Sequence, residues 1–365
     1  MIKVLHILAG ADIGGISQVV VNYCRYINSK DISIDVAFTT DCEGQNANHL
    51  REMGVNIYQL PIKSHDIKKY QRKLIELLEK TKYDCIHVHE NSTSYVALRI
   101  AKKKGIKIRV AHAHSCVVGE SMIAKIKRLS GCIFNYVYAT NLISCGEKAG
   151  DIVYGKIAML SKKSVILKNA IETQKFVYSE ELRKEIRKDL EMENKYIIGM
   201  VGRLSKEKNI YFILKLMEEL RISIPNIHLL LIGDGEERNG LEKYILDNGI
   251  QDIVTLYGKT NFVEKYYNAL DLLVLPSFYE GFPLVVVEAV ASGLPVITST
   301  NVSDEISIFE DVSRIDLEDI DEWKMKIRIN GVNNKNRKLK SNKFYKYGFD
   351  IKNNVEILEK IYMSK

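Results

Sequence analysis

Two basic side chains stand close together where a short apolar run gives way to a helix. Residues 197–201 are typical of a buried strand, and the run Gly202-Arg203-Leu204-Ser205-Lys206-Glu207-Lys208-Asn209 follows them directly. An arginine fork and a lysine ammonium on one strand-to-helix loop suit a diphosphate, above all one that gains negative charge as its bond to a sugar breaks. A solvated basic loop is the alternative for Arg203 and Lys208, and isolated basic clusters usually have that meaning.

Two glutamates flank a second turn. Glu280 precedes Gly281-Phe282-Pro283, and Glu288 lies within the apolar helix that we expect over 284–291. This spacing places Glu280 at the loop edge and Glu288 on the second helical turn, where both could meet one ligand. Carboxylates accept hydrogen bonds from vicinal hydroxyls, so a sugar or a ribose is the natural partner. A surface position is the alternative for Glu288, but its apolar neighbours predict burial with a polar partner.

A glycine loop closes the first predicted strand. Residues 10–15 depart from the pattern G-x-G-x-x-G, and no acidic residue follows a second strand at the position that would bind a ribose, so a nicotinamide enzyme is disfavoured. Gly14 and Gly15 stand just before a helix, where backbone N–H groups can approach a phosphate. A plain tight turn is an equally good interpretation.

The elements that position these residues come in two series. Buried-strand-like runs alternate with helical stretches from residue 3, and the alternation starts again at 196–201. We therefore predict an α/β protein with two Rossmann-like, doubly wound domains whose strand ends face each other across a cleft. The boundary is expected near Asn169, giving domains of residues 1–169 and 170–349.

Composition and charge narrow the class of protein. The 365 residues are 46% hydrophobic and 27% charged with 5 prolines, which excludes a small binding module and a disordered chain. The net charge of +7 is uneven, because residues 1–170 carry 25 basic and 14 acidic side chains. Six cysteines without a C-x-x-C pair, no signal-like N-terminus and no long apolar stretch favour a reducing, cytoplasmic location.

Taken together, these segments resemble the retaining family 4 glycosyltransferases of the GT-B fold, in particular the bacterial enzymes of capsular polysaccharide and exopolysaccharide synthesis. The resemblance covers nearly the whole chain. It rests on six motifs in sequence order: Gly14-Gly15, 111–115, 165–171, 201–204 with Lys208-Asn209, 232–235, and 275–283 through Glu288-Ala289.

The resemblance implies a role for each motif residue. Arg203 and Lys208 would hold the donor diphosphate and stabilise it as a leaving group, Glu280 would bind the transferred sugar and Glu288 the ribose. His114 matches the histidine near the reacting sugar, and His112 is its rival two residues earlier. The remaining donor-binding positions are Gly14, Gly15, Gly202, Gly233, Gly281, Phe282, Pro283, Leu284 and Val285.

The activity implied is transfer of a sugar from a nucleotide diphosphate sugar, with uridine as the commonest base among relatives, to a glycan or lipid-linked saccharide. No cofactor or metal is expected, because no D-x-D motif is suitably placed and basic side chains would neutralise the diphosphate. The helix of residues 350–365 should cross back to the first domain. Asn169-Ala170-Ile171-Glu172 departs from the family's Asn-Gly-Ile-Asp at the hinge.

The basic first domain also suggests a surface for the acceptor. Apolar and basic residues alternate over 122–129, and Lys102-Lys103-Lys104 lies nearby, so this stretch could contact an anionic membrane at its cytoplasmic face. An ordinary solvated helix is the alternative. No nucleic-acid motif accompanies the charge. Two rival functions stay open: a sugar-nucleotide epimerase of the same fold, and a glycan-binding subunit without activity.

Overall fold

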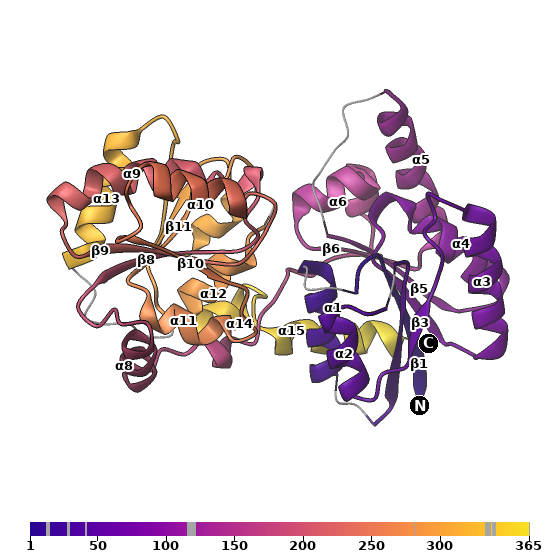
Figure 1. Cartoon of the computed structure of the whole chain (residues 1–365). Helices are drawn as coiled ribbons and strands as arrows, with labels where there is room; N and C mark the ends of the chain where they lie inside the picture. Colours follow the sequence, from indigo (N-terminus) through magenta and orange to yellow (C-terminus); the bar gives the residue numbers. More distant parts are fainter. Residues whose placement is uncertain are drawn as a thin grey trace. The chain divides into compact units, whose positions relative to one another are not determined.

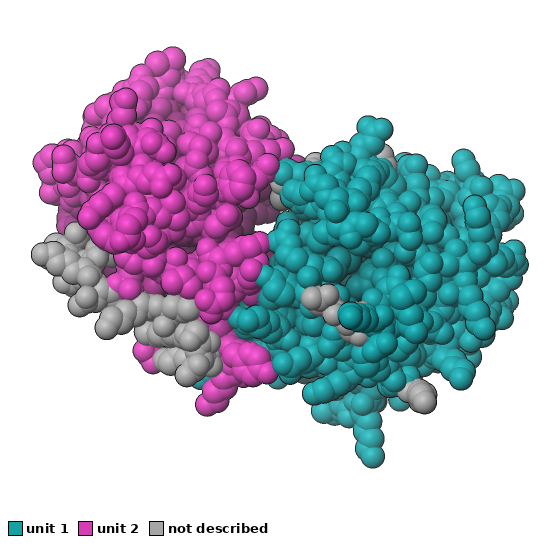
Figure 2. Space-filling model, turned by 90° about the horizontal axis from the view of Figure 1, so that it is seen from below, with its two compact units in different colours: residues 1–170, 347–365 teal, residues 171–346 magenta. Residues whose placement is uncertain are grey.

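The computed structural model describes residues 1–11, 15–27, 30–40, 42–114, 122–280, 282–332, 337 and 341–364, with the backbone alone at 15, 122–128, 331–332 and 341–343. The chain forms two compact units (Figures 1 and 2). Unit 1 comprises residues 1–170 and 347–365, and unit 2 comprises residues 171–346. Each unit is built around one parallel sheet, so the predicted fold class of two Rossmann-like domains is confirmed.

Unit 1 contains a seven-stranded sheet in the order β3-β2-β1-β4-β5-β6-β7. Its central strands are buried on both faces, which explains their nearly continuous apolar sequences, whereas the edge strands β3 and β7 are partly exposed. In chain order the strands are β1 (Ile2–Leu8), β2 (Ile32–Phe38), β3 (Ile57–Gln59), β4 (Cys85–Val88), β5 (Ile108–Ala113), β6 (Asn141–Ser144) and β7 (Ser164–Ile166).

Helices cover both faces of this sheet (Figure 1). On one face lie α1 (Gly15–Tyr26), α2 (Gln45–Glu52) and α15 (Ile351–Tyr362). On the other lie α3 (Ile67–Lys80), α4 (Tyr95–Lys103), α5 (Met122–Tyr138), α6 (Glu147–Tyr154) and α7 (Lys156–Met159). Helix α3 shows the predicted amphipathic pattern, because the apolar residues on one of its sides are buried in the core. Its N-cap is Asp66, whose side chain accepts a hydrogen bond from the backbone N–H of Lys69.

Helix α15 returns from unit 2 to unit 1, as the family resemblance led us to expect. Its residues Val355 and Leu358 are buried in one cluster with Val4 of β1 and Tyr23 of α1. In Figure 1 the yellow α15 accordingly lies beside the indigo α1. The apolar stripe of α15 therefore completes the core of unit 1.

Unit 2 contains a six-stranded parallel sheet in the order β10-β9-β8-β11-β12-β13. The strands are β8 (Tyr196–Val201), β9 (Ile227–Ile232), β10 (Val254–Gly258), β11 (Leu272–Leu275), β12 (Val296–Ser299) and β13 (Val312–Ile315). One face is covered by α9 (Ile210–Ser223), α10 (Arg238–Asp247) and α13 (Ile320–Val332). The other is covered by α8 (Glu180–Asp189), α11 (Val263–Ala269), α12 (Leu284–Ala291) and α14 (Ser341–Lys346) (Figure 1).

Each sheet reverses its strand order once. The reversal falls between β1 and β4 in unit 1 and between β8 and β11 in unit 2. Ligands of open α/β sheets bind beyond the carboxyl ends of the strands at this switch point. The residues that follow these four strands are therefore the first place to look for chemistry.

Candidate functional site

An ion pair spans the switch point of unit 2. The Nζ atom of Lys208, which follows β8, lies 2.5 Å from Oε2 of Glu280, which follows β11. Both side chains are largely buried, with 16% and 24% of their surfaces exposed. Lys208 and Glu280, predicted separately from two motifs 72 residues apart, therefore lie together.

Backbone contacts fix both partners. Lys208 ends a 3-10 turn over Lys206–Lys208, and Asn209 then takes a left-handed conformation with φ of 52° before α9 begins. The N–H of Phe278 donates to the carbonyl of Glu207 at 2.8 Å, and the N–H of Ser303 donates to the carbonyl of Glu280 at 3.1 Å. The first bond ties the loop after β8 to the loop after β11, and the second ties the loop after β11 to the loop after β12.

Arg203 does not converge on the same point. Its side chain is 73% exposed, and its Nε donates to Oε2 of Glu236 at 2.9 Å. Exposed ion pairs of this kind typically contribute only about 0.2–1 kcal/mol, so this contact can be exchanged for a ligand at little cost. The shared binding of one anion by Arg203 and Lys208 remains a prediction.

The glycines of this region have a packing role. Gly202 and Gly233 have φ of +137° and +144°, and a Cβ on Gly233 would lie 1.8 Å from the carbonyl oxygen of Gly202. A Cβ on Gly235 would lie 2.3 Å from the carbonyl oxygen of Leu204. Glycine is thus required for the loops after β8 and β9 to approach each other, whatever ligand they bind.

Glu288 is largely buried and has a polar partner, as its apolar neighbours in the sequence predicted. The hydroxyl of Tyr267 on α11 donates to Oε2 of Glu288 at 2.8 Å. The pKa of Glu288 is raised to about 7, because burial and the charge of Glu264 raise it more than the hydrogen bond from Tyr267 lowers it. The carboxyl group therefore changes its charge near neutral pH.

The turn before α12 carries the other predicted donor-binding positions. Pro283 is the N-cap, and Leu284 and Val285 form the first turn, preceded by Phe282. Gly281 lies outside the described residues, as do Gly14 and 115–121. Gly15 begins α1. Of the predicted membrane stretch 122–129, only the side chain of Leu129 is described, and it is 64% exposed.

Unit 1 carries a layer of imidazoles at its switch point. His6 of β1 pairs in register with His87 of β4, and His89, His112 and His114 complete what we call the histidine layer. His89 donates to, or accepts from, His6 at 2.9 Å and His114 at 2.7 Å. His112 is fully buried, whereas His114 is partly accessible, so His114 is the better candidate to meet a ligand.

Burial lowers the pKa of all five histidines. The pKa of His6 falls to about 3, and that of His114 to about 4, where the neighbouring side chain of Asn169 opposes the effect. The pKa values of His87, His89 and His112 are lowered well below the ordinary value, also by burial first. The whole layer is therefore neutral at pH 7.

The same layer contains the candidate metal ligands. The groups His6, His87, His89 and His89, His112, His114 each offer ligand atoms within 4.8 Å of one another. Five of the nitrogen contacts in and around these groups are hydrogen bonds, however, and the rings of His112 and His114 are stacked with centroids 3.9 Å apart. Coordination needs in-plane lone pairs that converge on one point, which stacked rings do not provide.

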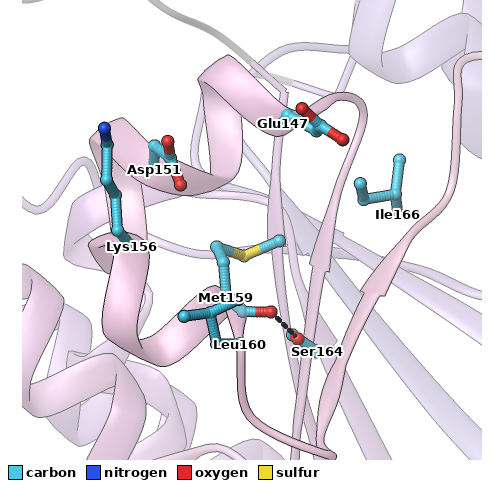
Figure 3. A pocket seen from close by; sticks show the side chains of 7 residues that line it. All are labelled: Glu147, Asp151, Lys156, Met159, Leu160, Ser164 and Ile166. Atoms are coloured by element: carbon cyan, nitrogen blue, oxygen red, sulfur yellow. Dashed lines mark hydrogen bonds between the residues drawn. The ribbon is translucent and has the colours of Figure 1, made fainter.

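A depression of about 590 Å³ lies beside the edge strand β7 (Figure 3). Glu147 and Asp151 of α6 and Lys156 of α7 supply its charges, so it carries more negative than positive groups. Met159, Leu160 and Ile166 add apolar surface, and the hydroxyl of Ser164 donates to the carbonyl of Met159. Sequence reasoning missed this site because its residues carry no motif.

Comparison with known proteins places both halves of the chain in families. Residues 13–174 match the family model described as Glycosyltransferase Family 4, and residues 182–328 match Glycosyl transferases group 1. The chain is 27% identical over 282 residues to a Bacillus subtilis protein named as the glycosyltransferase EpsF, covering 75% of this chain and 73% of that one. It is 28% identical to the UDP-Gal:alpha-D-GlcNAc-diphosphoundecaprenol alpha-1,3-galactosyltransferase of Escherichia coli, over 56% and 54% of the two chains.

Solved structures share the fold. HepE of Anabaena in complex with UDP-glucose superposes with a TM-score of 0.74 at 16% identity, covering 99% of this chain and 95% of that one. TarM of S. aureus, solved with UDP and saccharide ligands, has a TM-score of 0.75 at 13% identity over the full length of both chains. Identities at this level speak to the fold alone.

Proposed function

The chain belongs to the GT-B glycosyltransferases, with a family 4 domain followed by a group 1 domain, and from this premise we propose that it transfers a sugar from a UDP-sugar to a lipid-linked saccharide with retention of configuration. The product would enter surface polysaccharide synthesis. The observation that carries the proposal is the Lys208–Glu280 pair at the switch point of unit 2.

In that pair, Glu280 fixes the ammonium group of Lys208 at the place where we propose that the diphosphate binds. Lys208 would contact the diphosphate, with Arg203 exchanging Glu236 for the same anion, while Glu280 accepts hydrogen bonds from the transferred sugar. In the proposed step the bond between the anomeric carbon and the diphosphate breaks. The acceptor oxygen bonds that carbon from the same face, and its proton passes to the departing diphosphate. Donors aimed at that developing charge lower the barrier.

Glu288 would hold the nucleoside. Its carboxylate can accept from two vicinal ribose hydroxyls while Tyr267 keeps it oriented. Uridine is the proposed base, because HepE was solved with UDP-glucose, TarM was solved with UDP, and the E. coli relative is named for UDP-Gal. We propose that no metal takes part, since Lys208 and Arg203 supply the positive charge that a divalent ion would otherwise bring.

Unit 1 would bind the acceptor. The depression lined by Glu147 and Asp151 suits a neutral saccharide, because carboxylates accept hydrogen bonds from hydroxyls. His114, partly accessible after β5, would lie near the reacting sugar. The E. coli relative is named for a saccharide on diphosphoundecaprenol, which supports a lipid-linked acceptor.

An apolar surface with one basic side chain, Lys163, adjoins that depression. Tyr136 and Val137 of α5 and Ile157 and Leu160 near α7 are exposed, and Leu160 also lines the depression. The ammonium of Lys163 lies over the ring of Tyr136, which connects the two segments. Such a surface can rest on an anionic membrane. No helix among the described residues is long and apolar enough to span one.

Vesicle binding tests this surface. We expect the protein to co-sediment with vesicles containing anionic lipid and Ile157→Glu to weaken that binding. Ile222→Glu is the matched control, because Ile222 is equally exposed but lies on α9 of unit 2. Equal loss with both variants, or no binding at all, would contradict the membrane surface.

Nucleotide binding and turnover test the enzyme itself. We expect UDP, without Mg²⁺, to raise the melting temperature more than GDP, ADP or CMP. UDP should then be released from UDP-sugars only when a diphosphoundecaprenol-linked saccharide is added, with an α-configured product by NMR if the donor is α-configured. Conversion of the sugar without acceptor would indicate an epimerase, and binding without release would indicate a non-catalytic subunit.

A further inference from the structure

A second lysine–glutamate pair lies in unit 1. Nζ of Lys63, which follows β3, lies 2.5 Å from Oε2 of Glu90, which follows β4, and the two side chains are 14% and 5% exposed. Glu90 comes directly after His89 of the histidine layer. Strand β4 borders the switch point of unit 1 as β11 borders that of unit 2. Glu90 and Glu280 therefore follow equivalent strands of the two sheets.

Lys63 has no N–H group left for an anion. Besides Glu90, its ammonium group contacts Oγ1 of Thr93 at 3.0 Å and the carbonyl of Thr93 at 3.3 Å. An ammonium group has three donors, so all of them are used within the unit. The ammonium group of Lys208 in unit 2, by contrast, contacts only Glu280 in the described part of the chain. Because the charges of Lys63 and Glu90 balance, the pair in unit 1 suits an uncharged ligand.

Glu90 keeps one carboxylate oxygen for such a ligand. The contacts of its side chain with Lys63 and with the hydroxyl of Tyr70, at 3.5 Å, both involve Oε2. No described residue donates a hydrogen bond to Oε1. The side chain has little access to water, so an unpaired oxygen is costly there. A ligand hydroxyl would supply the missing donor.

The next residue offers the complementary donor. Asn91 takes a left-handed conformation with φ of 50°, and its Oδ1 accepts a hydrogen bond from the backbone N–H of His114 at 2.9 Å. A backbone N–H can only donate, so this contact identifies the oxygen and the nitrogen of the amide. None of the described residues accepts a hydrogen bond from Nδ2. Asn91 is half-buried, so its N–H groups can meet a ligand.

Helix α5 supports this turn. Nδ2 of the fully buried Asn135 donates to the carbonyl of Asn91 at 3.2 Å. A Cβ on Gly131 would lie 2.5 Å from the carbonyl oxygen of Ser92, so glycine lets α5 approach the turn closely. Lys63 holds the same turn through Thr93. Glu90 and Asn91 are therefore positioned before any ligand binds.

We propose that Glu90 and Asn91 form a saccharide subsite beyond the carboxyl ends of β4 and β5. Oε1 of Glu90 would accept a hydrogen bond from one sugar hydroxyl, and Nδ2 of Asn91 would donate to the oxygen of a neighbouring one. The inference rests on the proposed function, because it adds a second contact for the acceptor to the depression beside β7. Lys63 and Asn135 are positioning residues, because they act through Glu90 and Asn91.

Saturation-transfer difference NMR with uncharged sugars tests the subsite. The probes are the methyl α-glycosides of glucose, galactose, mannose and N-acetylglucosamine, without nucleotide. We expect the native protein to give a signal with at least one of them. Asn91→Asp keeps the left-handed backbone and the bond from His114 but replaces the donor with an acceptor, so the signal should fall at least several-fold. No signal from any of the four with the native protein would overturn the subsite.

Asn141→Asp is the matched control. Asn141 lies at the amino end of β6, and its Oδ1 accepts a hydrogen bond from the hydroxyl of Thr140 at 2.8 Å. This variant adds the same charge to unit 1 and keeps a bond of the same kind, but at the opposite edge of the sheet. It should leave the glycoside signal unchanged. Equal losses in the two variants, or no loss in Asn91→Asp, would contradict the subsite.

Glu90 is tested by removing the whole pair, because Glu90→Met alone would leave Lys63 buried without its opposite charge. In the double variant Lys63→Met, Glu90→Met we expect a similar fall in the glycoside signal. Lys104→Met, Glu79→Met is the control, since it removes another lysine–glutamate pair of unit 1, at the C-terminal ends of α3 and α4. Full binding in the first double variant would contradict the role of Glu90.

Turnover separates the subsite from a purely structural role. We expect Asn91→Asp to raise the KM for the diphosphoundecaprenol-linked saccharide several-fold and to leave the KM for the UDP-sugar unchanged. A rise in both, or a fall in kcat alone, would overturn the subsite. Glycoside binding does not depend on transfer. A protein that binds the glycosides through Asn91 but never releases UDP would therefore refute the proposed function and leave the subsite intact.

Discussion

The two sheets reverse their strand order in the same way, but the two switch points carry opposite chemistry. Between β8 and β11 lies a charged pair, Lys208 and Glu280, on loops that glycines bring together. Between β1 and β4 lies a buried layer of neutral imidazoles. The topology thus sets where a ligand binds, and the residues after each strand decide whether a charged or a neutral group binds there.

The sharpest difference between the units should appear in acid. Each buried neutral histidine has a pKa below its unfolded value of about 6.5, so the unfolded chain binds more protons and the free energy of unfolding falls as pH drops. Unit 1 has five such groups, so its free energy of unfolding should fall by up to about 7 kcal/mol for each pH unit below pH 6.5. Unit 2 has one, His228, whose pKa burial lowers to about 4.

The chain's single tryptophan makes this measurable. Trp323 belongs to the core of unit 2, so its fluorescence reports that unit, whereas circular dichroism reports both. We expect part of the helical signal to be lost at a higher pH than the change in tryptophan fluorescence. Coincident transitions would contradict the difference between the units.

The charged switch point should dominate turnover. Lys208→Ala removes the buried cation expected to stabilise the leaving diphosphate, and loss of one such donor costs roughly 10²–10³-fold in kcat. Lys206→Ala is the control, because Lys206 lies on the same turn but is exposed. Initial rates of UDP release measure both. If Lys208→Ala stays within about twofold of the native rate, the donor site is wrongly assigned.

Glu288 should respond to pH with the sign opposite to that of the histidines. Its pKa of about 7 lies above the unfolded value near 4.5, so the native state binds the extra proton and the free energy of unfolding falls as pH rises from 4.5 to 7. The full effect is up to about 3 kcal/mol. Glu288→Gln should abolish it in urea titrations followed by Trp323 fluorescence, and an unchanged pH slope would contradict the assignment.

The smallest effect is expected at the depression beside β7. Asp151→Asn preserves the shape of the depression but makes this side chain a weaker hydrogen-bond acceptor. The KM for the acceptor saccharide should therefore rise by several-fold, which corresponds to about one hydrogen bond. The KM for the UDP-sugar should not change. A rise in the donor KM instead would move the depression to the donor side of the reaction.

The sequence predicted the fold better than the contacts of the site. Alternation of apolar strands and helices indicated both sheets, because that pattern is local. The Lys208–Glu280 pair and the Tyr267–Glu288 bond were not predictable, because they join loops and helices far apart in the chain. Their distances depend on strand order, which no local pattern encodes.

The histidine layer was partly predictable from the sequence. The spacings 87–89 and 112–114 on buried strands place each pair on one face of a sheet. That signal was available, but only the order β1-β4-β5 brings His6 beside them, and only α15 adds Tyr362. The sequence analysis singled out His112 and His114 and left the other three unassigned.

The return of α15 also sets an order of events during synthesis. A ribosome makes all of residues 171–346 before it makes α15, so unit 2 has its whole sequence while unit 1 still lacks one covering helix. Until Tyr362 emerges, the nascent unit 1 holds its imidazoles under an incomplete core. The first unit to begin translation is therefore the last whose sequence is complete, because its core needs both ends of the chain.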